Sequence, residues 1–239
     1  MLLPNAWDVA SAAVLAAAGF AAVGTTSLGV AAAHGLPDGR NAARAETLDL
    51  ARRLGHLDIP LTVDIEGGFG GGPQAVAGLA AELAADGVNI EDGRADGTLT
   101  PVEEQVTLIA AIKARVPDLF VNARTDTHWL HAGDLDETLR RAEAYLEAGA
   151  DGIFVPGLAG DDSIRTVVSR LDAPLNVLLL PGLTVPALAA LGVARISTGS
   201  LLFRAALGAA VDTARAVAAG HPAPPGVPSY AEVNSLAVH

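Results

Sequence analysis

The sequence predicts an α/β protein, a (β/α)8 TIM barrel with a short C-terminal tail and helix. Strand-like and helix-like segments alternate eight times along the 239 residues, which is the pattern of parallel strands joined by helices. No run of consecutive strands or helices interrupts this alternation. The unusual polar residues fall where the strands end, as they do in barrel enzymes. An open, doubly wound sheet is the alternative fold.

Apolar segments bounded by Gly, Pro or polar residues predict the strands, and Ala-rich or amphipathic segments predict the helices. The expected strands cover residues 1–4, 20–26, 61–65, 88–91, 119–123, 152–155, 175–180 and 195–198. The expected helices cover residues 6–18, 42–55, 74–85, 101–116, 134–149, 162–170, 185–191 and 201–219, and residues 27–41 are expected to form a Gly-rich loop.

Two of these helices carry start signals, and a tail follows the last of them. The stretch Thr100-Pro101-Val102-Glu103 predicts a capping box with proline at the first helical position. Asp134 is expected to start its helix in a similar way. Residues 221–228 are Pro-rich, and residues 229–237 predict one last short helix. We therefore expect a barrel domain over residues 1–220 and a tail over 221–239.

Composition narrows the classes of function. The chain has 15 Lys and Arg against 27 Asp and Glu, a net charge of −12, which argues against a nucleic-acid or anionic-membrane partner. It has no Cys, so it has no disulfide, no thiolate nucleophile and no Cys-based zinc site. The N-terminus has no basic segment of a secretory signal, and the longest apolar run is too short to span a bilayer. A cytoplasmic protein is expected.

Two carboxylates at the end of the third expected strand indicate a metal site. Asp64 and Glu66 are two residues apart, so they share one face of the strand. Neighbouring carboxylates repel each other unless a cation lies between them, and Mg²⁺ favours such oxygen ligands. A helix cap or a solvated loop explains Glu66 alone fairly well, but it explains the pair poorly because the strand is otherwise buried.

Polar residues on neighbouring strand ends extend this candidate site. Glu91 follows the next strand, and Arg124 and Asp126 follow the one after it. Arg124 could form a structural ion pair with Asp126, or its guanidinium could hold a carboxylate or phosphonate in a bidentate fork. Asn176, in the seventh strand, is a further candidate for binding substrate. A metal opposite an arginine would suit a 2-oxo acid.

Several stretches in order along the chain carry a family resemblance. They are Leu3-Pro4-Asn5-Ala6-Trp7-Asp8, Thr25-Thr26-Ser27, Gly29-Val30-Ala31, Gly35-Leu36-Pro37-Asp38-Gly39, Val63-Asp64-Ile65-Glu66-Gly67-Gly68-Phe69-Gly70, Val88-Asn89-Ile90-Glu91-Asp92, Asn122-Ala123-Arg124-Thr125-Asp126 and Gly149-Ala150-Asp151-Gly152-Ile153-Phe154-Val155-Pro156. With these stretches the sequence resembles the phosphoenolpyruvate mutase/isocitrate lyase superfamily, including its 2-methylisocitrate lyase and oxaloacetate decarboxylase-like members.

The resemblance implies a barrel that binds Mg²⁺, with Mn²⁺ as the alternative, and a small α-keto or α-hydroxy acid. It implies homodimers or homotetramers that exchange C-terminal helices, which would give the tail a purpose. The implied roles, by position, are Asp64 as the direct metal ligand, Glu66 and Glu91 as ligands through water, Thr26, Ser27 and Leu28 as the carboxylate cradle, Asp38 as a catalytic loop acid, and Arg124 as the substrate-binding and catalytic arginine.

One departure from the superfamily bears on the reaction. Its lyase branch carries a Lys-Lys-Cys-Gly-His type motif on a mobile loop after the fourth strand, whereas residues 93–99 here contain no Cys, Lys or His. Decarboxylation needs no loop acid, because solvent can deliver the proton. We therefore expect a Mg²⁺-dependent lyase or decarboxylase that cleaves a C–C bond through a pyruvate enolate. A phosphonate mutase or hydrolase, and a non-catalytic barrel that binds metal and keto acid, are the alternatives.

Overall fold

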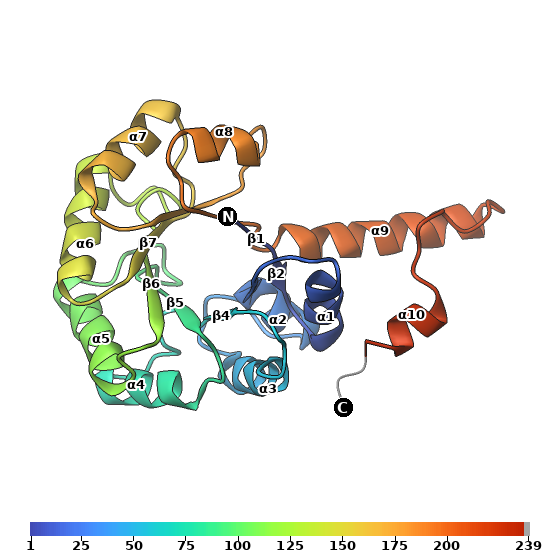
Figure 1. The fold of residues 1–239 in the computed structure, drawn as a ribbon, viewed down its shortest axis with the longest axis horizontal. Coiled ribbons are helices and arrows are strands. Elements are labelled where there is room, and N and C mark those ends of the chain that lie inside the picture. Colours follow the sequence, from blue (N-terminus) through green and yellow to red (C-terminus); the bar gives the residue numbers. More distant parts are fainter. Residues whose placement is uncertain (237–239) are drawn as a thin grey trace.

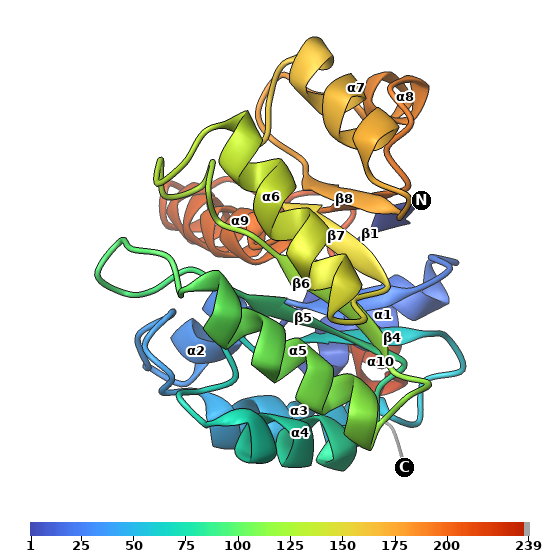
Figure 2. The same ribbon diagram turned by 90° about the vertical axis from the view of Figure 1, so that its left-hand side faces the viewer.

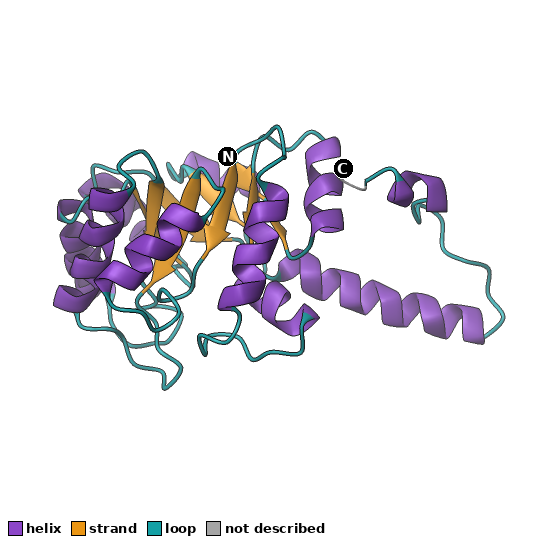
Figure 3. Cartoon of the chain, turned by 90° about the horizontal axis from the view of Figure 1, so that it is seen from below, coloured by secondary structure: helices purple, strands orange, loops and turns teal. Residues whose placement is uncertain are grey.

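The computed structural model describes residues 1–236, in which parallel strands form a ring enclosed by helices (Figures 1 and 3). The strands are β1 (Leu2–Leu3), β2 (Asn5–Ala6), β3 (Val23–Thr25), β4 (Leu61–Asp64), β5 (Gly87–Glu91), β6 (Phe120–Arg124), β7 (Gly152–Val155), β8 (Leu175–Leu178) and β9 (Arg195–Ser197). The helices are α1 (Val9–Ala17), α2 (Ser27–Ala33), α3 (Arg44–Leu54), α4 (Pro73–Glu82), α5 (Val102–Arg115), α6 (Leu135–Glu147), α7 (Asp161–Arg170), α8 (Val185–Ala190), α9 (Leu201–Ala218) and α10 (Tyr230–Asn234).

The ring closes at the first strand. β1 pairs with β9, and β2 pairs with β3, all in parallel. Only Pro4 separates β1 from β2, so the two segments form one barrel strand that contacts the last strand on one side and the second on the other. The predicted (β/α)8 barrel is therefore confirmed, and the open sheet is excluded.

The first helix begins later than its apolar pattern suggests. Residues 6–18 were expected to be helical, but Ala6 belongs to β2 and pairs with Thr25. Asp8 then caps α1: its Oδ1 accepts the Ser11 N–H at 2.7 Å, and Ser11 Oγ accepts the Asp8 N–H at 3.2 Å. This reciprocal capping box stops strand pairing and starts the helix at Val9.

The expected loop over residues 27–41 contains a helix that the sequence analysis missed. α2 starts directly after Thr26, its N-cap residue. A side chain at Gly29 would put a Cβ 2.7 Å from Trp7 Cβ and 2.8 Å from Thr26 Cγ2. A glycine is needed at position 29 because α2 packs tightly against the start of the chain. Gly29 therefore reflects close packing and does not indicate a loop.

The expected cap signals have mixed outcomes. The capping box at Thr100 is wrong: Pro101 is the N-cap residue, without a side-chain bond, and Thr100 Oγ1 instead accepts from Arg94 Nε at 3.2 Å. The Asp134 cap is confirmed, since its carboxylate accepts the Glu137 N–H at 3.0 Å. The expected last helix is α10, and the Ala237 end of that expectation lies outside the described residues.

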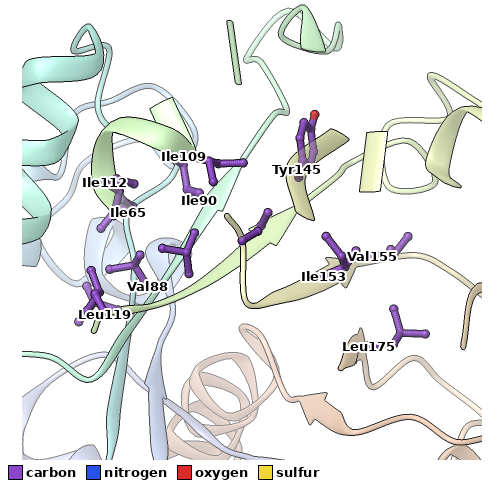
Figure 4. Packing of buried hydrophobic residues seen from close by; sticks show 14 of the residues in the cluster. Ile65, Val88, Ile90, Ile109, Ile112, Leu119, Tyr145, Ile153, Val155 and Leu175 are labelled. Carbon is purple, nitrogen blue, oxygen red and sulfur yellow. The ribbon is translucent and has the colours of Figure 1, made fainter. Parts of the chain in front are cut away.

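The apolar core lies between the barrel and its outer helices. Alternate strand residues such as Val63, Val88 and Ile153 point outward and are fully buried there, together with Ile109 and Ile112 of α5 (Figure 4). Because neighbouring strand residues face opposite sides, the intervening positions line the barrel interior. Many of these interior positions hold polar side chains, and they carry the groups described below.

The C-terminal helices lie apart from this core. α9 extends away from the barrel, and the chain then turns back so that α10 lies on the side of α1 (Figures 1 and 3). Leu207, Val211 and Val217 on α9 are about half exposed. In the part of the chain that the structure describes, no helix is long and apolar enough to cross a membrane.

A buried network of ion pairs and hydrogen bonds joins the end of β5 to α6, the helix that lies over β6 and β7 in Figure 2. Asp92 is fully buried, and its Oδ2 accepts hydrogen bonds from Tyr145 Oη at 2.7 Å and Arg141 Nη1 at 3.0 Å. Its Oδ1 accepts the Asp126 N–H at 2.8 Å. Burial and the Asp92 charge raise the pKa of Tyr145, so its hydroxyl remains a donor. Asp92 thereby positions the backbone that carries Asp126.

Replacing Asp92 should destabilise the fold strongly. We expect Asp92→Ala to lower the free energy of unfolding by ~3 kcal/mol, the lower end for breaking a buried ion pair, because Glu137 still contacts Arg141. Urea unfolding measures this difference. The control is Asp58→Ala, which removes an exposed carboxylate; equal unfolding midpoints for the two variants would contradict the structural role of Asp92.

Candidate active site

An arc of charged side chains lies at the carboxyl ends of three adjacent strands. Asp64 is the last residue of β4, and Glu66 follows it. Glu91 and Arg124 are the last residues of β5 and β6, and the two are paired in register. The alternation of the strands and the parallel pairing therefore bring together the four charged residues that the sequence predicted at this rim.

Asp64 is held by hydrogen bonds at the bottom of this arc. Its N–H donates to Thr25 Oγ1 at 2.9 Å, and its Oδ1 accepts the Glu66 N–H at 3.0 Å. Burial raises the pKa of Asp64, an effect that the Arg124 charge opposes. A buried carboxylate with a raised pKa is a group that a cation would favour in its charged form.

Glu66 has an unusual backbone and an unpartnered oxygen. Its φ is 49°, in the left-handed region that non-glycine residues rarely adopt. Its Oε2 accepts the Asn41 N–H at 3.0 Å, whereas its Oε1 is buried without a hydrogen-bond partner among the described residues. Burial raises the pKa of Glu66 to about 7, and the charges of Asp64 and Asp38 add to this effect. The strained backbone thus holds a free carboxylate oxygen inside the site.

Arg124 balances the acidic arc. Its Nη1 lies 2.6 Å from Glu91 Oε2, and its Nε and Nη2 donate to the two Asp126 oxygens at 2.6 and 3.0 Å. Burial lowers the pKa of Arg124, but the Glu91 and Asp126 charges outweigh burial and raise it overall. The structural ion pair with Asp126 is therefore present. It orients the guanidinium toward Glu91, while the substrate role of Arg124 stays a prediction.

The three predicted metal ligands do not form a compact cluster. Over residues 1–236, no group of three or more His, Cys, Asp or Glu side chains is close enough to hold an ion directly. The orphaned Glu66 Oε1 and the oxygen-only donor set nevertheless fit a hard cation such as Mg²⁺, which retains several waters. Asp64, Glu66 and Glu91 remain the candidates to hold it.

The other predicted residues fall into two groups. Thr26, Ser27 and Leu28 surround the start of α2 directly after β3, where backbone N–H groups have no partner within the helix. Asp38 lies in the exposed loop after α2, and its charge raises the pKa of both Asp64 and Glu66, which places it within electrostatic reach of them.

Asn176 lies within β8 rather than at its carboxyl end. Asn176 is the second residue of β8, and its side chain exchanges hydrogen bonds with Ser197 Oγ at 3.0 Å. It lines a cavity at the opposite, amino-terminal end of the barrel. The role of Asn176 in binding substrate stays a prediction.

Two arginines at the rim were missed by the sequence analysis. Arg40 and Arg94 line, together with Glu66 and Glu91, a cavity of about 540 Å³. Arg40 belongs to the loop that Asn41 turns with a φ of 59°, and no motif marks it in the sequence. Its loop position and positive charge near an acidic arc are the only signals that it offered.

The segment after β5 forms a short hairpin. Gly93 and Leu99 form an antiparallel bridge, and the Arg94 N–H donates to Thr98 O at 2.9 Å. Arg94 also binds Glu104 through Nη2 at 3.0 Å, which ties the hairpin to α5. The loop that lacks Cys, Lys and His is thus internally bonded and anchored.

The chain is similar to known proteins over most of its length. The family model described as phosphoenolpyruvate phosphomutase matches residues 1–218. An uncharacterised protein of Mycobacterium tuberculosis is 46% identical over 99% of this chain and 92% of its own length. The 2-methylisocitrate lyase of Bacillus subtilis is 37% identical over 72% of this chain and 60% of its length, and the oxaloacetate decarboxylase of Ectopseudomonas mendocina is 32% identical over 76% and 67%.

Solved structures share the fold. A candidate phosphonomutase of Burkholderia cenocepacia has a TM-score of 0.85 and 40% identity, covering 90% of this chain and 93% of its own. A phosphonopyruvate hydrolase in complex with oxalate and Mg²⁺ has a TM-score of 0.86 and 28% identity, covering 99% and 89%. Relatives at this level of similarity thus include lyases, a decarboxylase and phosphonate enzymes.

The raised pKa of Glu66 should appear in the pH dependence of stability. Between its ordinary value of 4.5 and about 7, the metal-free native protein retains a proton that the unfolded chain has released. The free energy of unfolding should therefore fall as pH rises through this window. We expect the free energy of unfolding of Glu66→Gln to be higher than that of the native protein by up to ~3 kcal/mol at pH 8. At pH 4.5 the two free energies should be equal.

Urea unfolding in EDTA at several pH values measures this difference. Glu103→Gln, which changes an exposed glutamate on α5, is the matched control and should follow the native curve. If the free energy of unfolding of Glu66→Gln differed from that of the native protein by the same amount at every pH, the raised pKa of Glu66 would be wrong.

Proposed function

The chain belongs to the phosphoenolpyruvate mutase family, and within it we propose that the protein is a Mg²⁺-dependent lyase or decarboxylase of a small α-keto or α-hydroxy carboxylic acid. The observation that carries this proposal is the arc of Asp64, Glu66 and Glu91 opposite Arg124 at the carboxyl ends of the strands. We further propose that the protein works in the cytoplasm on freely diffusing acids, without a nucleic-acid or membrane partner.

The carboxylates would hold the metal ion. Asp64, with its backbone and one oxygen fixed by Thr25 and Glu66, is the proposed direct ligand, and Glu66 and Glu91 are the proposed ligands through water. A divalent cation bound there would stabilise the negative charge that develops on an enolate oxygen. The solved phosphonopyruvate hydrolase complex contains Mg²⁺ and oxalate, which supports the proposal.

Arg124 and the start of α2 would hold the substrate carboxylate. Asp126 accepts hydrogen bonds from Nε and Nη2 of the Arg124 guanidinium. Nη1 is then directed at the carboxylate of Glu91. The unpaired N–H groups after Thr26, with the Ser27 hydroxyl and the Leu28 backbone, offer hydrogen bonds to the carboxylate. These contacts would orient the bond that breaks without supplying a proton.

Proton delivery distinguishes the candidate reactions. The hairpin over residues 93–99 offers no Cys, Lys or His, and His34 is exposed, with its Nδ1 on Val30 O at 2.9 Å. Water can protonate the enolate that decarboxylation leaves, so this reaction suits the residues present. A lyase with a dedicated acid would have to use His34 or Asp38, and the charge of Asp38 reaches Asp64 and Glu66.

A phosphonate mutase or hydrolase of the same superfamily is the second candidate. Arg40 and Arg94 line the site cavity, and a phosphonate carries more negative charge than a carboxylate. The 40% identity to a candidate phosphonomutase over nearly the whole chain also favours it. A barrel that binds metal and keto acid without turnover is the third.

We expect Mg²⁺-dependent release of pyruvate from one acid of a panel. The panel contains oxaloacetate, isocitrate, 2-methylisocitrate and phosphonopyruvate, with glyoxylate as the product followed for isocitrate. Asp64→Ala and EDTA should each reduce turnover at least ~100-fold, because enolate stabilisation is lost. Arg165→Met on α7, an exposed position far along the chain, is the control and should retain full activity.

The outcomes separate the three candidates. Release of pyruvate from oxaloacetate or 2-methylisocitrate, or of glyoxylate from isocitrate, supports the C–C lyase. Pyruvate from phosphonopyruvate alone supports a phosphonate hydrolase, and conversion of phosphonopyruvate to phosphoenolpyruvate without release of pyruvate supports a mutase. Turnover that survives Asp64→Ala would contradict the metal assignment. Mg²⁺-dependent binding of oxalate without any product would favour the non-catalytic barrel.

We also propose that α9 and the tail form contacts in a homodimer or homotetramer. α9 extends from the barrel with Leu207 and Val211, one turn apart, both about half exposed. Tyr230 and Val233 of α10 are exposed as well, and together with Val9 they line a shallow cavity. A group of exposed apolar side chains on one surface is typical of a site that another protein surface covers.

Negative charges introduced on the apolar face of α9 should prevent the chain from associating with itself. We expect the double variant Leu207→Glu/Val211→Glu to elute as a monomer while the unchanged chain elutes as a dimer or tetramer, because burying two carboxylates is costly. Size-exclusion chromatography with light scattering measures the mass. Ala110→Glu on the exposed face of α5 is the control; a monomeric unchanged chain would contradict the proposal.

A further inference from the structure

A second cavity lies at the end of the barrel opposite the acidic arc. It has a volume of about 440 Å³, within the range of small-molecule sites. Its walls are mainly apolar and include Leu3, Ala22, Leu61 and Phe120. The first residues of strands β4, β6 and β9 contribute to it, so it opens at the amino-terminal ends of the strands. None of the residues proposed above for metal or substrate, Asn176 excepted, lines this cavity.

One cation projects into these apolar surroundings. Arg195, the first residue of β9, lines the cavity, and its guanidinium lies 5.7 Å from the centre of the Phe120 ring. Its one hydrogen bond to protein runs from Nη2 to Asn89 Oδ1 at 3.1 Å. Within the described residues, no Asp or Glu oxygen lies within 4.0 Å of it. Burial lowers the pKa of Arg195 to about 10, and no neighbouring charge opposes this.

The other half-buried and buried arginines show what is missing. Arg124 contacts Glu91 and Asp126, and Arg141 contacts Asp92 and Glu137. Asp86 also lines the second cavity, but its carboxylate accepts the Leu61 N–H at 2.8 Å rather than pairing with Arg195. Cations removed from water are normally paired, so Arg195 has the environment of a ligand-binding arginine.

The polar neighbours of Arg195 are already occupied. Asn89 Oδ1 also accepts from Asn122 Nδ2 at 2.8 Å, and Asn176 is bonded to Ser197. A guanidinium has five N–H donors in a fixed fork, and most of those on Arg195 have no protein acceptor. This layer of amides lies between the cavity and the rim residues, so the two sites are separate.

We propose that this cavity is a second binding site, for an amphipathic monocarboxylate. The carboxylate would pair with Arg195, and the hydrocarbon body would lie against Phe120, Leu61 and Leu3. The guanidinium of Arg195 selects a negative charge, and the apolar lining selects an apolar body rather than a second carboxylate. The inference does not depend on the reaction performed at the opposite end.

The test is calorimetric titration of the full chain with octanoate in EDTA. Octanamide, which has the same chain without the charge, is the ligand control. Arg195→Met removes the cation and keeps an unbranched side chain; Arg165→Met, at an exposed site on α7, is the matched control. Ala194→Trp keeps Arg195 but fills the exposed mouth of the cavity beside it.

We expect octanoate to bind the unchanged chain and Arg165→Met equally. Its Kd should rise at least ~10-fold in Arg195→Met and in Ala194→Trp, and octanamide should bind at least ~10-fold more weakly than octanoate, as expected for loss of a partly desolvated charge pair. Thermal unfolding without ligand checks the fold: Arg195→Met should be no less stable than the unchanged chain, because it removes a cation without a carboxylate partner.

Three results would overturn the proposal. The first is no binding of octanoate to the unchanged chain. The second is equal affinity in Arg195→Met, or in Ala194→Trp if the methionine variant does not fold. The third is displacement of octanoate by oxalate in a parallel titration with Mg²⁺ in place of EDTA, which would place octanoate at the rim rather than in this cavity.

Discussion

The charge balance at the carboxyl ends of the strands governs this structure. Asp64, Glu66, Glu91 and Asp126 are gathered there around one guanidinium, that of Arg124. Four carboxylates and one cation cannot all be charged and buried without further compensation, and the raised pKa values of Asp64, Glu66 and Glu91 express that conflict. These carboxylates are held close together by the strand register, the Thr25 hydroxyl and the left-handed backbone at Glu66. A bound divalent cation would relieve it.

Three arginines illustrate how the same side chain serves different purposes inside one barrel. Arg141 is locked between Asp92, Glu137 and Tyr145, and it secures the strand end that carries Asp126. Arg124 is paired with Glu91 and Asp126 at the carboxyl ends of the strands, where the substrate is proposed to bind. Arg195 lies in the barrel interior with an amide as its one protein partner. Arg141 and Arg124 each contact two carboxylates, whereas Arg195 contacts none, and this difference marks Arg195 as the candidate ligand site.

The sequence predicted the barrel and the rim because both depend on local periodicity. Alternation placed Asp64, Glu66, Glu91 and Arg124 at neighbouring strand ends without knowledge of any contact. It failed where tertiary contacts decide. Gly29 resembled a loop glycine, but it is small because Trp7 packs against α2; Thr100 resembled a cap, but Arg94 takes its hydroxyl. The approach of Arg40 to the site depends on the path of its loop, which no sequence pattern encodes.

The anchored hairpin over residues 93–99 has a kinetic consequence. Its two arms are joined by the Gly93–Leu99 bridge, and Arg94 binds Glu104 of α5. If these contacts persist during turnover, residues 93–99 do not have to move before a product leaves. Enzymes with moving lids are often limited by that motion, which solvent friction slows. In a site bordered by a fixed hairpin, small acids would exchange by diffusion alone. The turnover rate would then follow the chemical step and would be insensitive to solvent viscosity.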